Sequence, residues 1–295
     1  MLRVGLFIAT NLAIIVLASL TFQLLGLEQM LSSNGVNMDL TSLLIFCAVF
    51  GMSGAFISLL ISKPMAKRSM KVQIVEQANT SQQRWLVDTV TELAQQAGIK
   101  TPNIGIFPSQ VSNAFATGWN KNSALVAVSE GLLNRFTPAE AKAVLAHEIG
   151  HVANGDMITL TLVQGVINTF VMFFARIIGM LADRLIFKSQ RGNGPGYWIV
   201  TIVAQIVLGI LASTIVMWFS RWREYRADAA GAELAGTAAM IGALQRLQAE
   251  QDIPTELPEQ LMAFGISGDK KDTISRLFMT HPPLAERIEA LRQAG

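Results

Sequence analysis

Four long apolar stretches restrict what this chain can fold into. They cover residues 4–26, 41–62, 157 to about 181, and 197–219. All but the third lack charged residues, and each is long enough to cross a bilayer as a helix, which takes about 20 residues. Charged residues make up only 15% of the chain, against roughly 25% in soluble proteins. The sequence therefore predicts a mainly α-helical membrane protein with four membrane helices, two N-terminal and two in a later hairpin.

The first stretch invites a second interpretation, as a secretory signal peptide. Its apolar run exceeds the roughly 7–15 residues of a signal-peptide core, and a second long apolar run follows closely. We therefore interpret residues 4–26 as an uncleaved membrane helix.

The basic residues predict the orientation of these helices. The loop 27–40 contains none, whereas four follow the second stretch: Lys63, Lys67, Arg68 and Lys71. Because short cytoplasmic loops carry an excess of lysine and arginine, we expect the N-terminus and the region after residue 62 to be cytoplasmic. The hairpin 157–219 then returns the chain to the same side, whether it spans the bilayer or inserts partway. Its basic tip suits an external position poorly.

Two polar regions remain, residues 63–156 and 220–295. Apolar residues at helical spacing, followed by a glycine, predict a helix over residues 80–98. Three short β-prone runs follow, at 103–107, 112–118 and 124–129, and the polar residues between the last two indicate a hairpin. We expect a small β-sheet here, and mostly helices in residues 220–295.

A helix with clear start and stop signals carries the main motif. Thr137, Pro138 and Glu140 form a capping-box sequence, and Asn154-Gly155 is a typical stop. Between them, His147 and His151 are four residues apart and therefore lie on one helical face. Two imidazoles at this spacing can hold one Zn²⁺ ion, and a glutamate beside the first can reach water activated by the metal. Glu148 occupies that position.

A catalytic zinc site needs a third protein ligand and an open position. His281 is one candidate. The other is Glu224, which lies four residues before Asp228 just after the fourth apolar stretch. Asp228 could then accept a hydrogen bond from a ligand histidine and fix its tautomer. Since one membrane hairpin separates His147 from Glu224, both are predicted to lie on the same side of the membrane.

Motifs along nearly the whole chain resemble the HtpX-type membrane zinc metalloproteases, a family that includes the CAAX prenyl endopeptidases. They are the paired N-terminal spans, "NAFATG", "HEIGHVANGDM", "REYRADAAGA" and "FMTHPPLAERI". The resemblance implies one Zn²⁺ per subunit held by His147, His151 and Glu224, with Glu148 as general base and Asp228 supporting a ligand. It also implies a zincin-like cytoplasmic α+β catalytic domain and a role in membrane-protein quality control. The matching location is the bacterial inner (plasma) membrane.

These expectations divide the chain into four parts. Residues 1–62 hold two transmembrane helices, and residues 157–219 hold the second membrane hairpin. Residues 63–156 and 220–295 form the two cytoplasmic catalytic regions, the second supplying the third zinc ligand.

Two further sites follow from the resemblance. The strand with Asn113, Ala114 and Phe115 is the edge strand where substrate adds in extended form, although strand propensity alone also allows an ordinary strand. His281 is expected in the cleft with Arg287, where a positive group can stabilise an oxyanion. The alternative places Arg287 on a solvated helix face.

The predicted function is hydrolysis of unfolded or misfolded protein segments beside the lipid bilayer. A net charge of +2 gives no reason to expect nucleic-acid binding. One rival is an intramembrane zinc protease, which the polar, capped flank before His147 disfavours. Another is a non-catalytic membrane scaffold with a structural metal site. The sequence does not indicate an oligomeric state.

Overall fold

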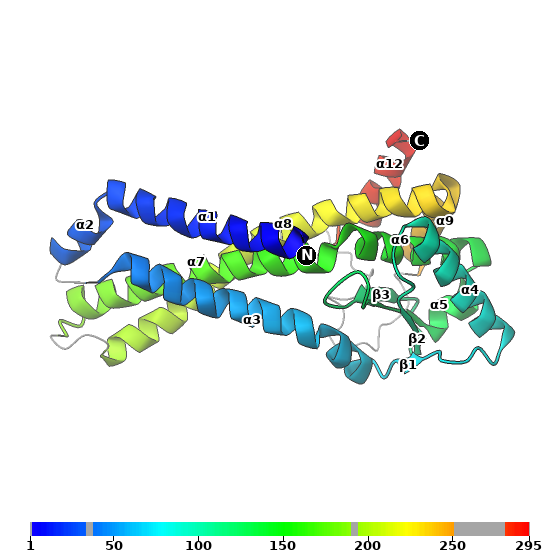
Figure 1. Cartoon of the computed structure of the whole chain (residues 1–295), viewed down its shortest axis with the longest axis horizontal. Coiled ribbons are helices and arrows are strands. Elements are labelled where there is room, and N and C mark those ends of the chain that lie inside the picture. The colour runs from blue at the N-terminus through cyan, green and yellow to red at the C-terminus, as the bar shows by residue number, and fades with distance from the viewer. Residues whose placement is uncertain (1, 34–37, 190–193, 251–280, 295) are drawn as a thin grey trace. The chain divides into compact units, whose positions relative to one another are not determined.

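The computed structural model describes residues 2–33, 38–189, 194–250 and 281–294. The chain forms two compact units, one comprising Met1–Ile57 and Thr161–Val216, the other Ser58–Leu160 and Met217–Gly295. Figure 1 labels most elements of both units. The four-part division drawn from the sequence stays a prediction.

Long helices build the first unit, with parts of three of them continuing into the second. They are α1 (Leu2–Leu24), α2 (Leu27–Ser33), α3 (Leu40–Ser69), α7 (Asp156–Leu185) and α8 (Pro195–Ala235). Within the described residues, α3, α7 and α8 are long and apolar enough to cross a membrane, and the end of α1 qualifies only together with α2 as a pair bent by 55°. Three spans are therefore supported, and the fourth stays a prediction. The loop expected at 27–40 contains helix α2.

Apolar packing joins the helices of the first unit. Its buried cluster includes Leu31 of α2, Leu44 and Cys47 of α3, and Phe173 of α7. Phe22 of α1 stacks on Phe173 with ring centroids 5.1 Å apart. Many large apolar side chains on the same helices are exposed. This pattern suits helices whose outer faces contact lipid, because lipid tails solvate apolar side chains without cost.

A four-stranded sheet forms part of the second unit. Its order is β1-β2-β4-β3, with β2 and β4 parallel and the outer pairs antiparallel. The strands are β1 (Gln73–Ile74), β2 (Asn103–Phe107), β3 (Ala114–Thr117) and β4 (Leu125–Ser129). The three strands expected from sequence are present, and β3 and β4 form the expected hairpin. Strand β1 was not expected, because two residues are too short to show a period.

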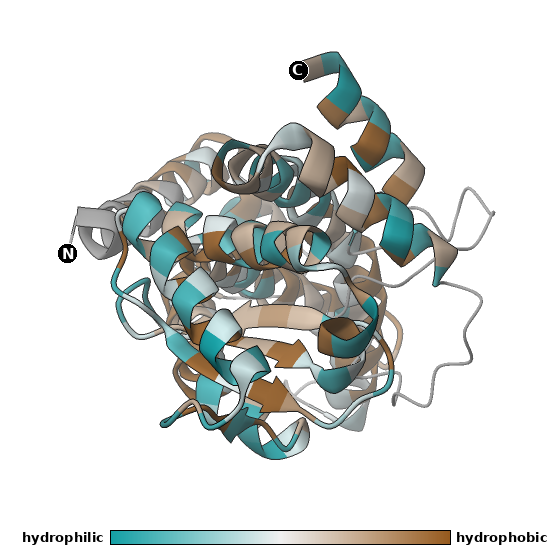
Figure 2. Ribbon diagram, turned by 90° about the vertical axis from the view of Figure 1, so that its right-hand side faces the viewer, coloured by the Kyte–Doolittle hydropathy of each residue, from teal (hydrophilic) through white to brown (hydrophobic). Residues whose placement is uncertain are grey.

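Helices pack against this sheet and against each other. They are α4 (Ser81–Gln96), α5 (Glu130–Arg135), α6 (Pro138–Asn154), α9 (Thr237–Ala249) and α12 (Leu284–Ala294). The nine residues from Ala143 to His151 are all buried except His151, which is partly buried. Helix α6 therefore lies at the centre of this unit. Figure 2 shows apolar residues along the strands and a mixture of polar and apolar residues on the surrounding helices. The core therefore lies between sheet and helices.

Local signals explain where α6 begins and ends. The Thr137 hydroxyl accepts a hydrogen bond from the backbone N–H of Glu140, whose carboxylate in turn accepts one from the backbone N–H of Thr137. Gly155 ends the helix in the left-handed region at φ 69°. A side chain with a β-carbon is disfavoured there, so the glycine allows α7 to start in a new direction one residue later.

Candidate metal centre

Helix α6 presents its two histidines to the interior of the second unit. His147 is 2% exposed, and His151 is 12% exposed at its side chain. Their ring centroids are 4.7 Å apart with the ring planes nearly perpendicular. Glu148, between them in sequence, is also buried. Three polar side chains buried on one helix are costly unless they have partners, and the partners come from other elements.

Helix α8 supplies the first partner, Glu224. Its carboxylate is fully buried, with Oε2 3.5 Å from His147 Nε2 and Oε1 3.3 Å from His151 Nε2. One donor atom from each of these three residues lies within 4.8 Å of the others. The structure thus brings together the three residues that the sequence analysis named as zinc ligands.

Small residues allow α8 to come this close to α6. A β-carbon placed on Gly150 would lie 2.9 Å from the β-carbon of Ala230, a separation that real contacts do not reach. A β-carbon on Gly231 would lie 3.2 Å from the backbone nitrogen of His147. These glycines therefore let the two helices pack backbone to backbone, which places Glu224 within reach of both imidazoles.

Asp228, one turn after Glu224, contacts the other side of the first histidine. Its Oδ1 lies 2.9 Å from His147 Nδ1. Because a carboxylate only accepts hydrogen bonds, Nδ1 must carry the proton and donate it. This leaves Nε2, which faces Glu224, as the ring nitrogen that would bind a metal. This is the contact that the sequence analysis expected of Asp228.

Arg287 on α12 holds Asp228 in place. Its Nε donates to Asp228 Oδ2 at 2.7 Å, and its Nη2 donates to Oδ1. The side chain is 1% exposed, so the alternative of a solvated helix face for Arg287 is wrong. A two-pronged guanidinium–carboxylate pair of this kind fixes the carboxylate plane, and through it the His147 ring.

Asp156 plays the corresponding part for the second histidine and was not predicted from the sequence. This residue begins α7, is 1% exposed, and places Oδ2 2.8 Å from His151 Nδ1. Each histidine therefore donates one ring N–H to a buried carboxylate and directs the other nitrogen towards Glu224. An acid five residues after His151, just past a helix stop, was the available signal.

We expect Asp156→Asn to weaken metal binding by about 10- to 100-fold, the usual loss when a carboxylate that orients a ligand histidine is removed. The measurement is competition with a chromophoric chelator. Asp88→Asn is the matched control, because Asp88 is exposed on α4. Equal affinity in the Asp156 variant and the parent would show that the contact does not orient His151.

The electrostatics of the cluster favour a cation. Burial alone would lower the pKa of the His151 imidazole, but the charge of Glu224 and the hydrogen bond to Asp156 raise it to about 10. The pKa of His147 is raised in the same way, since hydrogen bonds to Asp228 and Glu224 outweigh its burial. The negative charge that raises the pKa of both histidines also favours the binding of a metal cation.

The donor set fits a bound metal. Among the described residues, neither buried oxygen of Glu224 accepts a well-aligned hydrogen bond. A fully buried carboxylate without such partners is expensive. A metal ion would satisfy these oxygens together with the two Nε2 atoms.

His281, the other candidate ligand, contacts the same carboxylate. Its Nδ1 lies 2.8 Å from Glu224 Oε2, although the contact is not aligned as a hydrogen bond. Arg287 Nη1 approaches the same oxygen at 3.6 Å. His281 therefore lies beside the cluster, as expected, and its role there stays a prediction.

The strand β3 lies at the edge of the sheet. Asn113, just before it, is 1% exposed, and both its side-chain amide atoms lack a partner among the described residues. Ala114 is buried, and Phe115 packs in the core with its ring centroid 5.5 Å from that of Phe107. The side chains of all three residues are thus buried, and their part in substrate binding stays a prediction.

Comparison with known proteins relates this geometry to a family. The model of peptidase family M48 matches residues 80–294. The chain belongs to this family. Protease HtpX of Pseudomonas putida (strain W619) is 62% identical over 295 residues, covering 100% of both chains, and so is Protease HtpX of Pseudomonas fluorescens (strain Pf-5). This M48 peptidase is thus a multi-pass membrane metalloendopeptidase.

A solved structure shares the fold of this M48 peptidase. The crystal structure of S. mikatae Ste24p aligns with a TM-score of 0.64 at 22% sequence identity. The alignment covers 98% of this chain and 66% of the Ste24p chain. At this identity the likeness shows the fold alone, which is that of a helical membrane protein with a small mixed sheet.

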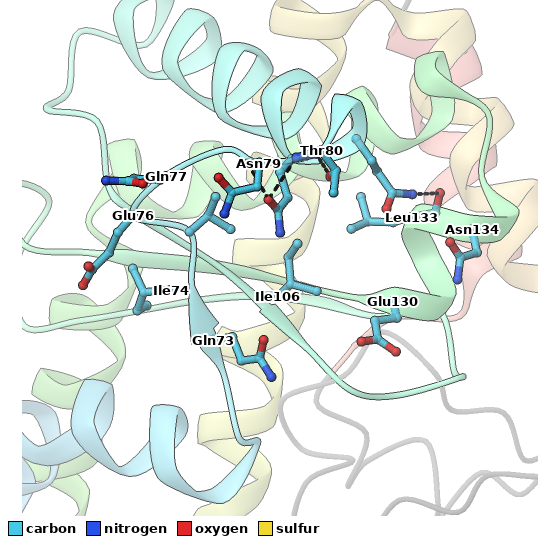
Figure 3. A pocket seen from close by; sticks show the side chains of 13 residues that line it. Gln73, Ile74, Glu76, Gln77, Asn79, Thr80, Ile106, Glu130, Leu133 and Asn134 are labelled. Atoms are coloured by element: carbon cyan, nitrogen blue, oxygen red, sulfur yellow. Dashed lines mark hydrogen bonds between the residues drawn. The ribbon is translucent and has the colours of Figure 1, made fainter.

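A polar cleft of about 600 Å³ lies elsewhere on the same unit, between β1, the start of α4, and α5. Figure 3 shows that Glu76 and Glu130 approach it from different segments. Its lining contains none of the residues around Glu224 and no histidine or cysteine. This cleft therefore lacks the histidine ligands that the buried cluster offers.

Proposed function

We propose that this chain is a zinc-dependent endopeptidase of the bacterial inner membrane that hydrolyses misfolded or damaged membrane proteins on the cytoplasmic side. The observation that supports it most is the convergence of His147, His151 and Glu224 on one point. Two imidazoles and one carboxylate are a donor set of catalytic zinc sites, which keep a further position open. When bound, zinc supplies Lewis-acid polarisation of a carbonyl and lowers the pKa of water.

The remaining chemistry belongs to the chain itself. Glu148 follows His147 directly on α6 and is buried beside the cluster. We assign it the role of general base, which takes a proton from the attacking water and passes it to the leaving amine. Asp228 and Asp156 hold the Nδ1 protons of the two histidines and so keep Nε2 of each ring directed inward.

Hydrogen-bond donors next to Glu224 suit the negative charge that develops on the scissile carbonyl oxygen. We assign this part to His281, whose ring contacts Glu224 and is 22% exposed at its side chain. Arg287 is buried and holds Asp228, so we assign it a positioning role. Oxyanion stabilisation requires donors that are already in place, and the contact of His281 with Glu224 supports such a position.

Substrate is proposed to bind as an extended strand along β3. An edge strand offers unpaired backbone groups to an incoming chain, and β3 ends the sheet order. The unpartnered amide of Asn113 supports this, because a buried donor and acceptor without partners are costly. An unfolded segment has free backbone groups to satisfy the edge, which a folded domain lacks.

Two alternatives are less well supported. An intramembrane protease would carry its motif inside an apolar span, but α6 is not among the helices that could cross a membrane, within the described residues. A non-catalytic scaffold would not need Glu148 beside the cluster, and the chain belongs to a peptidase family. The basic residues that follow the second apolar stretch support the cytoplasmic side.

Metal removal and replacement test the proposal. We expect the full chain in lipid nanodiscs to contain one zinc per chain, to lose casein cleavage after chelation, and to recover it with stoichiometric Zn²⁺. Casein is unfolded, so a compact folded domain of similar size should resist cleavage under the same conditions. Cleavage that persists after complete metal removal would contradict the metalloenzyme. Equal cleavage of folded and unfolded substrates would contradict the proposed substrate class.

A further inference from the structure

An exposed tryptophan lies on the turn between β3 and β4. Trp119 is 49% exposed. The other exposed large apolar side chains among the described residues of the second unit all lie on α3 or α8: Leu60, Ile61, Met65, Trp218 and Trp222. Those two helices are candidate membrane spans. Among the described residues of this unit, Trp119 is therefore the one exposed large apolar side chain that does not lie on a candidate membrane helix. Its exposure needs another reason.

The turn that carries Trp119 is well defined. The Asn120 side chain accepts a hydrogen bond from the Asn122 backbone N–H at 2.7 Å, and the Ser123 backbone N–H donates to the Asn120 carbonyl at 3.1 Å. Gly118 adopts φ 140°, and a β-carbon there would lie 2.8 Å from the Ser123 carbonyl oxygen. A closed turn of this kind holds the indole outward before any partner arrives, so little conformational entropy is lost on binding.

Lys63 ties the base of the turn to α3, at the point where the apolar stretch of this helix ends. It is the first residue after the apolar stretch 41–62. Its ammonium group donates to the carbonyl oxygens of Ser123 at 3.2 Å and Ala124 at 3.4 Å, and to the Asn103 side chain. The stretch is about the length that crosses a bilayer, so its last residues lie near the membrane surface. The turn is attached at this level.

The charges around the turn fit the same surface. Lys121 in the turn is exposed, as are Lys67 and Arg68 in the last turn of α3 and Lys71 just after it. None of these forms an ion pair with a carboxylate within the part of the chain that the structure describes. Tryptophan and lysine are the side chains that gather at the membrane–water boundary, and lysines there attract anionic headgroups.

We propose that residues 118–123 form a membrane-contacting turn, in which Trp119 enters the headgroup region of the bilayer that α3 spans while Lys121 binds anionic headgroups. This is a second contact with lipid, outside the spanning helices. Because β3 ends at Thr117, it also fixes one end of β3 at the membrane surface. Substrate segments that bind to β3 would then be held where they leave the bilayer. This consequence rests on the proposed function.

Spin-label accessibility tests the contact without measuring activity. A nitroxide is attached at Asn122→Cys in the turn or at Asn134→Cys, both exposed positions. Asn134 lines the polar cleft of Figure 3 and follows the opposite end of β4 from the turn. The parent chain serves as the control for background labelling, because its single cysteine, Cys47, is fully buried. The full chain is reconstituted in nanodiscs with and without anionic lipid, and collisions with oxygen and with a water-soluble nickel chelate are compared.

We expect the ratio of oxygen to nickel collisions to be several-fold higher at position 122 than at 134, and higher with anionic lipid. Trp119→Gln should remove most of this difference without altering the fold. Equal, water-like ratios at both positions would overturn the proposal, and no dependence on anionic lipid would overturn the assignment of Lys121. Protection at 122 that appears only after a peptide substrate is added would assign the turn to substrate instead. All three outcomes are independent of whether Glu148 acts as the base.

Discussion

Glu148→Gln should lower the rate of peptide-bond hydrolysis by about 100- to 10,000-fold, the range that a positioned general base contributes. Glutamine has nearly the same shape as glutamate but cannot accept the proton of the attacking water. The change adds no charge to a buried site. It also leaves His147, His151 and Glu224 intact, whose ligand atoms lie within 4.8 Å of one another. The variant should therefore fold and bind metal like the parent. The measurement is casein cleavage by purified protein, with zinc content determined on the same sample.

The control for this variant is Glu76→Gln, which makes the same change at an exposed position and should leave the rate unchanged. A folded, zinc-loaded Glu148→Gln protein that cleaves casein as fast as the parent would disprove the assigned mechanism. If activity falls because zinc is lost, Glu148 instead supports the metal.

Glu224→Ala is expected to have the largest effect on metal binding. Structural zinc sites bind with about 10–16 kcal/mol in total, so one of four ligands contributes roughly 3–4 kcal/mol. At about 1.4 kcal/mol per factor of ten, the predicted loss of affinity is about 100- to 1,000-fold, and activity should vanish at limiting zinc. Chelator competition measures the affinity.

Glu233→Ala is the matched control, because Glu233 lies on the same helix and is exposed. The Glu224 variant also removes a buried carboxylate that His151, His281 and Arg287 contact, so thermal unfolding is measured alongside and zinc affinity is compared on folded protein. Retention of parental zinc affinity in Glu224→Ala would exclude this residue as a ligand.

The sequence predicted the parts of the fold whose signals are local. Helix α6 has a capping box at Thr137 and a left-handed glycine at Gly155, and both appear in the structure as expected. The strand at 103–107 matches β2. The hydrophobic stretches at 41–62 and 157 to about 181 fall within α3 and α7. Each of these elements is determined by residues within its own length.

Features that depend on distant contacts were harder to predict. Asp156 follows a helix stop, and only the turn at Gly155 brings its carboxylate back to His151. The face of α12 that holds Arg287 could not be chosen from periodicity, because the burial of this arginine depends on Asp228, 59 residues earlier. Helix α8 continues from the apolar stretch to Ala235 without a break, although the change in composition at residue 219 suggested a boundary.

The most direct test of the account is to locate the metal itself. In a zinc-loaded structure of the full chain, anomalous scattering at the zinc edge should give one site per chain, bonded at about 2.0–2.2 Å to His147 Nε2, His151 Nε2 and an oxygen of Glu224. A metal bound elsewhere, or a Glu224 side chain turned away from the ion, would contradict it.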